Sequence, residues 1–142
     1  MAYWVFQCNP KKYDLAARLE DPEPRISWTV RPHHKKIGAG DVAFLWISGP
    51  DAGIRAVMEI ETAPLEMPEL TNELQYWVDG EDDGPELRVL GRLMEREVNL
   101  PRRILLATPE LSSLSILRRP QGTNFRVSPG EGVKLMELVL SD

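Results

Sequence analysis

Two apolar segments joined by a short glycine-containing linker constrain the fold of this chain most. Residues 42–48 (VAFLWIS) and 54–61 (IRAVMEIE) are apolar almost throughout, whereas a strand with one solvated face alternates apolar and polar residues. The linker Gly49-Pro50-Asp51-Ala52-Gly53 holds the residue types that form tight turns. This pattern predicts a β-hairpin whose two strands line the core.

Three further segments have the composition of strands. Residues 3–7 (YWVFQ) and 25–30 (RISWTV) are rich in aromatic and β-branched residues, and Asn9-Pro10 and Pro32 follow them as breaks. Residues 87–98 fit either a strand, by alternation with arginine, or a helix, by the spacing of their leucines. We favour a strand there.

The C-terminal end carries the clearest helix signal. Ser128, Pro129 and Glu131 form the pattern of a capping box with proline at the first helical position, which predicts a helix to about Leu140. Leucines four apart also predict a short helix within residues 13–19.

The whole chain, residues 1–142, is expected to form one domain without repeats or an internal linker. Its 42% hydrophobic content is enough for a normal core. Residues 62–72 contain two prolines and are expected to form a loop. We therefore predict a small α+β domain, a mixed or antiparallel β-barrel of five or six strands with flanking short helices and a C-terminal helix.

Charges are segregated along the chain, although the formal net charge is −5. Residues 25–40 hold four Lys or Arg, two His and no acid, whereas residues 59–86 hold ten acids and no Lys or Arg. Residues 102–126 hold five Arg against one acid. Such segregation can place one positive face on an acidic protein. Ordinary solvated surface is the alternative, and the residues leave both interpretations open.

Four tryptophans are the main candidates for an aromatic cage that stacks on a planar ring. Trp4 lies in an apolar strand and is expected in the core. Trp28 lies between polar residues just before the basic run, and Trp77 lies in an acidic, polar stretch. Trp46 ends a buried strand, where a cage and a core position are both open. A core position is the competing interpretation for each.

Residues that could carry catalysis or bind metal are scarce. His33 and His34 are adjacent, and Cys8 is the single cysteine, so no ligand set with metal spacing exists in the sequence. A hydrolytic triad also has few candidates. We expect no enzyme activity, no metal and no cofactor, and we place His33 among the residues that face phosphate.

A glycine-containing segment near the C-terminus offers another binding group. Residues 121–125 (QGTNF) follow Arg118-Arg119. Glycine allows close approach of a ligand to the backbone, and the Asn124 amide can pair with a base edge. A simple turn before the last helix is the alternative.

Several of these segments together resemble the EVE domain. The similarity rests on the order and spacing of YWVFQCNP, ISWTV, IGAGDVAFLWISGPDAGIRAVMEI and RRPQGTNFRVSPGEGVKLMEL. It spans Tyr3 to about Leu140, is strongest over residues 28–60 and 121–138, and is weak over residues 62–98. EVE domains belong to the PUA-like superfamily and are similar in fold to the YTH readers of methylated adenine.

The resemblance implies a reader of modified nucleobases that has no catalytic activity. In that pattern Trp28 is the first cage aromatic, Asn9 contacts the base, and a further aromatic comes from Trp46 or Trp77. Serine precedes Trp28 here rather than following it, so the side-chain hydrogen bond is expected from Thr29.

We therefore expect a module that binds a modified base in DNA or RNA. Arg31, Lys35 and Lys36 would contact flanking phosphates. The rival hypothesis is a pocket for a nucleoside or an aromatic metabolite, which the acidic balance favours. A lone cysteine fits a reducing cytoplasm. The N-terminus has no basic region followed by an apolar stretch, which predicts no signal peptide. The chain has no long apolar run, which predicts no membrane partner. A monomer is the favoured state.

Overall fold

Within residues 1–79 and 84–141, which the computed structural model describes, the chain forms eight strands, four α-helices and three short 3-10 helices. The strands are β1 (Tyr3–Cys8), β2 (Arg25–Thr29), β3 (Val42–Ile47), β4 (Gly53–Ile60), β5 (Leu65–Met67), β6 (Glu86–Glu95), β7 (Leu100–Pro101) and β8 (Asn124–Val127). The helices are α1 (Leu15–Glu20), α2 (Arg102–Leu106), α3 (Ser115–Arg118) and α4 (Pro129–Leu140), and the 3-10 helices are η1 (His34–Lys36), η2 (Thr71–Tyr76) and η3 (Pro109–Leu111).

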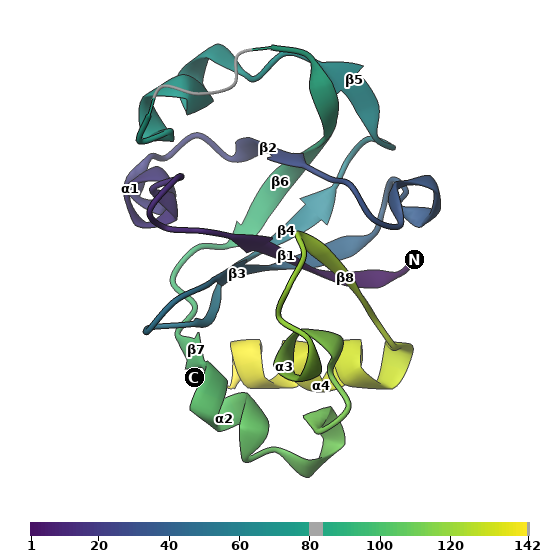
Figure 1. Ribbon diagram of the computed structural model, residues 1–142. Helices are drawn as coiled ribbons and strands as arrows, with labels where there is room; N and C mark the ends of the chain where they lie inside the picture. Colours follow the sequence, from purple (N-terminus) through teal and green to yellow (C-terminus); the bar gives the residue numbers. More distant parts are fainter. Residues whose placement is uncertain (80–83, 142) are drawn as a thin grey trace.

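All eight strands join one sheet in the order β2-β6-β4-β3-β1-β8, with β5 paired to β6 and β7 paired to β4 (Figure 1). β1 and β3 are parallel, and the other pairs are antiparallel. The predicted hairpin is confirmed as β3 and β4, with a shift of register between Leu45 and Trp46. The predicted strand over residues 87–98 is confirmed as β6, which ends earlier than predicted, at Glu95.

The sheet is buried on both faces, which explains why β3 and β4 are apolar almost throughout. Successive side chains point to opposite faces, so Trp4 and Phe6 enter one core while Val5 enters another. The first core consists of Trp4, Phe6, Tyr13, Leu15, Ile26, Trp28, Val30, Ile37, Ala43, Leu45, Ala56, Met58, Ile60, Val89 and Leu93. The second core lies between the sheet and α2, α3 and α4, which Figure 1 shows together on one side of the sheet.

The α+β class is confirmed, but the sheet is open where the sequence predicts a barrel. No ladder joins β2 to β8 among the described strands. A side chain bridges the gap instead: Asn124 of β8 accepts from the Arg31 backbone N–H at 3.1 Å and donates to the Pro32 carbonyl. The described strands also exceed the five or six expected, because the short β5 and β7 carry little pattern of their own.

The expected loop at residues 62–72 contains β5 and the beginning of η2. β5 has only three residues and pairs with the beginning of the long β6. β5 is held by backbone hydrogen bonds to β6 and has no buried apolar face. Its local sequence therefore carries no strand signal. No helix in the described part of the chain combines the length and the apolar character needed to cross a membrane.

Candidate ligand-binding pocket

A cavity of about 310 Å³ opens beside β1 and β2, at the edge of the first core. Its volume lies at the lower end of the roughly 300–1,000 Å³ typical of small-molecule sites, which suits one heterocycle. The chain contributes to it from several distant segments. The lining residues are Gln7, Cys8, Asn9, Lys12, Tyr13, Ser27, Trp28, Thr29, Arg31, Ser48, Glu69, Trp77, Glu86, Gly122 and Thr123.

Three aromatic side chains form one wall of this cavity. Trp28 is 7% exposed and packs against Phe6, whose ring centroid lies 6.4 Å away. Tyr13 meets Trp28 edge-on at 6.1 Å and lies 5.0 Å from the ring of Trp77. Offset and edge-on contacts of this kind are favourable between aromatic rings. The wall is therefore preassembled, with Trp28 held on its inner side by the core.

Backbone pairing brings Trp77 to this wall from a distant part of the sequence. Tyr13 and Trp77 form an isolated antiparallel bridge. The Asp14 N–H donates to the Tyr76 carbonyl at 2.8 Å, and the Val78 N–H donates to the Lys12 carbonyl at 2.9 Å. The loop after β1 and the end of η2 are thus fixed to each other.

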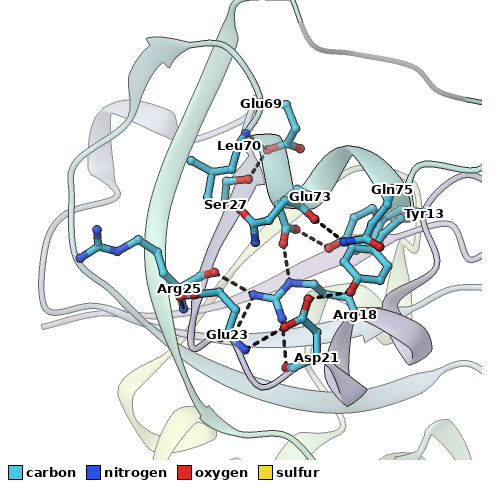
Figure 2. Close-up of polar contacts among 12 residues, drawn as sticks. Tyr13, Arg18, Asp21, Glu23, Arg25, Ser27, Glu69, Leu70, Glu73 and Gln75 are labelled. Atoms are coloured by element: carbon cyan, nitrogen blue, oxygen red, sulfur yellow. Dashed lines mark hydrogen bonds and ion pairs between the residues drawn. The ribbon is translucent and has the colours of Figure 1, made fainter.

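The polar side of the cavity is built around Glu69, which is 9% exposed. Its Oε1 accepts from the Ser27 hydroxyl and from the Leu70 N–H, the latter at 2.8 Å. Its Oε2 accepts from the Trp77 indole N–H at 2.9 Å. Figure 2 shows Glu69 above Ser27 and beside Leu70. A buried carboxylate thus shares the cavity with the aromatic wall.

Charges of alternating sign continue along this side from the interior to the surface. Glu69 Oε2 lies 3.9 Å from Nε of the fully buried Arg88, and another Arg88 nitrogen lies 3.4 Å from Glu86. Glu86 in turn pairs with the exposed Arg31 at 3.2 Å. This order balances the buried charges and holds Arg31 at the mouth of the cavity.

A second buried network supports the aromatic wall from behind. The Tyr13 hydroxyl donates to Glu73 at 2.5 Å, and Glu73 also pairs with the fully buried Arg18. Burial and the adjacent Glu73 charge raise the pKa of Tyr13, so its phenol keeps the proton that it donates. Arg18 also donates to the carbonyls of Glu23 and Arg25, at the start of β2 (Figure 2). This network ties α1, η2 and β2 together.

Two amide side chains hold the loops around the cavity. Gln7 donates to the carbonyls of Pro120 and Gly122 at 2.8 and 2.7 Å, which fixes the segment before β8 against β1. Asn124, 2% exposed, holds the segment after β2 through the contacts with Arg31 and Pro32 described above. The positions of Arg31 and Thr123 follow from these contacts.

The structure brings five of the residues predicted from sequence to this one cavity. They are Asn9, Trp28, Thr29, Arg31 and Trp77. The Asn9 side-chain oxygen accepts from the Lys11 N–H at 2.9 Å, which shapes the loop after β1.

Two other predicted ligand-binding residues lie outside the cavity lining. Trp46 is 2% exposed and packs in the second core, because its position in β3 points it to the sheet face covered by the helices. Asn124 is engaged with backbone groups, so its buried amide acts as a bridge between the sheet edges.

The remaining predicted phosphate contacts lie on one turn, which follows Arg31 in the chain. His33, Lys35 and Lys36 are exposed and occupy η1 and the residue before it, but they do not line the cavity. His33 has a φ of 59°, which is uncommon outside glycine, and its ring lies 6.0 Å from that of Trp4.

Sequence reasoning missed Tyr13 and Glu69. Tyr13 could have been identified from the sequence, because it follows the predicted contact residue Asn9 within a turn. Glu69 had no such signal: it lies between Pro68 and Leu70 in the segment expected to be a loop, and only tertiary contacts carry it to Trp77.

The cavity holds no activated nucleophile among the described residues that line it. Burial raises the pKa of the Cys8 thiol to about 12, so it stays protonated and unreactive near neutral pH. Neither histidine lines the cavity. Within residues 1–79 and 84–141, no group of three or more His, Cys, Asp or Glu side chains could hold a metal ion.

Comparison with known families and structures gave consistent results. A family model described as "EVE domain" matches residues 2–138. A search of curated proteins gave no match. Among solved structures, a hypothetical protein from Leishmania major is similar, with a TM-score of 0.71 and 16% identity over 99% of this chain and 96% of that one.

Two further solved structures are similar over almost the whole length. A Pseudomonas putida protein has a TM-score of 0.63 and 22% identity over 98% of this chain and 100% of that one. The human THYN1 protein, solved in complex with DNA containing 5-methylcytosine, has a TM-score of 0.66 and 15% identity over 100% of this chain and 99% of that one. At these identities the likeness establishes a shared fold.

Proposed function

Because this chain belongs to the EVE domain family, whose model covers residues 2–138, we propose that it is a non-catalytic module that binds a modified nucleobase in DNA or RNA. The observation that carries the proposal is the aromatic wall of Tyr13, Trp28 and Trp77 in a cavity sized for one heterocycle. The similar fold of the THYN1 protein, solved with 5-methylcytosine DNA, supports a nucleic-acid partner. It also makes 5-methylcytosine the first base to test.

In this proposal the base leaves its stack and enters the cavity. Unstacking requires a few kcal/mol, and stacking on an aromatic side chain returns about 1–3 kcal/mol per base. Asn9 and Thr29 contact the base edge, and Arg31 contacts a flanking phosphate. His33, Lys35 and Lys36, on the turn after Arg31, contact phosphates further along the nucleic acid.

The test is a fluorescence titration with oligonucleotides that differ only in one 5-methylcytosine, as DNA and as RNA. Wild-type protein is expected to bind the modified strand more tightly than the unmodified one. Trp28→Leu and Trp77→Leu should each weaken that binding by about tenfold or more, since each removes a stacking surface. Wild-type affinity in Trp28→Leu would overturn the proposal.

Trp46→Leu is the matched control, because Trp46 is equally large and buried but lies in the second core. It should lower the free energy of unfolding, as loss of core volume does, and leave the affinity within about twofold of wild type. Unfolding curves of all three variants separate loss of fold from loss of binding.

A second candidate function is binding of a free nucleoside or another aromatic metabolite. The carboxylates of Glu69 and Glu86 line the cavity, and the net charge is −5, both of which disfavour a phosphate chain. A thermal-shift screen that compares free nucleosides with modified oligonucleotides discriminates between the two. Stabilisation by nucleosides alone would favour this second function.

A further inference from the structure

Glu69 places a hydrogen-bond acceptor with spare capacity in the wall of the cavity. Each oxygen of an ionised carboxylate accepts about two hydrogen bonds. Oε1 already accepts from Ser27 and Leu70, and Oε2 accepts from Trp77. The 3.9 Å to Arg88 Nε is too long for a hydrogen bond. Among the described contacts, Oε2 therefore retains one acceptor position.

That oxygen lies at the junction of the two walls of the cavity. It receives the indole N–H of Trp77, whose ring contacts Tyr13. A planar ligand stacked on the aromatic wall thus presents an edge toward Glu69. The buried guanidinium of Arg88 lies 3.9 Å from Oε2 and offsets the carboxylate charge.

We infer that Glu69 selects heterocycles that carry an exocyclic amino group. An amino group donates to Oε2, whereas a carbonyl oxygen at the same position meets carboxylate lone pairs and is repelled. Carboxylates recognise the amino group of cytosine in this way, and a site built around a hydrogen bond discriminates strongly against analogues that lack it. The inference rests on the proposed function and names the class of base.

The rest of the cavity suits the other edge atoms of such a base. Lys12, Asn9 and Thr29 line the cavity and carry N–H or O–H donors. These donors match ring carbonyls, so a heterocycle with both an amino group and a carbonyl uses both sides of the cavity. Uracil-type rings, which carry two carbonyls, place one of them against Glu69.

The experiment compares three bases at one position of the same oligonucleotide, and as free nucleosides. 5-Methylcytosine carries the amino group, thymine replaces it with oxygen but keeps a ring N–H donor, and 5-methylpyrimidin-2-one simply lacks it. The pyrimidinone is the decisive analogue. Wild-type protein should bind 5-methylcytosine about tenfold more tightly than either analogue.

Glu69→Gln should remove this preference while keeping the side-chain volume. The Leu70 N–H favours the amide oxygen on its own side, so the amide NH₂ replaces Oε2. There it offers the ligand a donor and no longer accepts from the Trp77 indole N–H. The affinity ratio of 5-methylcytosine to the pyrimidinone should then fall below about threefold. Glu66→Gln is the matched control, because Glu66 is exposed on β5 and does not line the cavity.

Each outcome is decisive. Equal wild-type affinity for 5-methylcytosine and the pyrimidinone overturns the inference and leaves the proposed function standing. An unchanged preference in Glu69→Gln excludes Glu69 as its source. If no oligonucleotide binds, the nucleic-acid function fails. The inference is then decided by the ratio of affinities for the free nucleosides of 5-methylcytosine and the pyrimidinone. If no free nucleoside binds either, the inference is overturned.

A crystal structure of wild-type protein with 5-methylcytosine keeps the inference testable if Glu69→Gln fails to fold. A separation below about 3.2 Å between Glu69 Oε2 and the exocyclic nitrogen is expected. An amino group that points away from Glu69 overturns the inference.

Discussion

The indole N–H of Trp77 donates to Glu69 Oε2 at 2.9 Å, so one hydrogen bond joins the aromatic and polar walls of the cavity. The two residues flank η2 (Thr71–Tyr76), which carries the buried Glu73. Glu73 in turn contacts Tyr13 and Arg18. The geometry of the cavity therefore depends on buried polar contacts that attach η2 to the rest of the domain.

Glu73→Gln should lower the free energy of unfolding by about 3–5 kcal/mol, because it leaves the guanidinium of Arg18 buried without its counter-charge. Both side chains are 0% exposed. Urea denaturation followed by circular dichroism measures the change. The control is Arg25→Gln, which breaks an ion pair to Glu61 in which Arg25 is 57% exposed and should change stability by less than about 1 kcal/mol. Similar values for the two variants would contradict the importance of the buried pair.

Lys35→Ala combined with Lys36→Ala should make binding to modified oligonucleotides less dependent on salt. Each phosphate contact adds close to one to the slope of log affinity against log salt concentration, so the slope should decrease by about one to two. The ratio of modified to unmodified affinity should not change, since phosphate contacts carry no base information. Lys134→Ala, on α4, is the control. An unchanged slope in the double variant would exclude phosphate contacts by this turn.

Cys8 should resist alkylation in the folded protein. Burial raises its pKa to about 12 from an ordinary value near 9, so at pH 8 the folded state holds on the order of a thousandfold less thiolate than the unfolded state. Iodoacetamide labelling followed by mass spectrometry, with and without denaturant, measures the ratio. Equal rates in both states would contradict the raised pKa of this thiol.

The same shift fixes the sign of a pH effect on stability. The folded pKa is above the unfolded one, so the contribution of the protonated thiol is fully present below about pH 9 and is lost as the pH rises toward about 12. Cys8→Ala should show a shallower loss of stability across this alkaline window than the wild type.

Gly132→Ala should destabilise the protein, because a Cβ at that position of α4 would overlap the ring of Tyr3 on β1. Shifting the helix or the ring should cost about 1–3 kcal/mol. Gly130→Ala is the matched control in the same helix, where nothing lies within 4 Å of the added methyl group. It should stabilise by about 0.4–1 kcal/mol through the entropy of the unfolded chain. Thermal unfolding distinguishes the opposite signs.

The local sequence was sufficient to predict the elements whose signals are local. The capping box at Ser128 and Glu131 is present in the structure at the start of α4, because its hydrogen bonds join residues only three apart. The β3–β4 hairpin followed from two apolar runs and a turn. In β6, a side chain at Gly91 would overlap Met58 of β4. Glycine lowers the local strand propensity there, but it allows the two strands to pack closely.

The assignment of the tryptophans required the tertiary structure. Trp28 and Trp46 both lie in strands, and the sequence offered Trp28 as the first cage aromatic and Trp46 as one option for a further one. Alternation along β3 assigns Trp46 to the face that α2, α3 and α4 cover, but nothing local to β3 says which face the helices occupy. That information comes from the packing of residues more than 50 positions away.

The sequence by itself determined the class of the fold, most strands, the last helix and a set of aromatic and basic residues near β2, because periodicity and caps act over a few residues. Only the tertiary structure decided that the sheet stays open, that β5 pairs with β6, and that Tyr13, Trp77 and Glu69 meet at one cavity. Those outcomes depend on hydrogen bonds and packing between segments far apart in the chain. A local pattern of residues does not predict the free energy of such contacts.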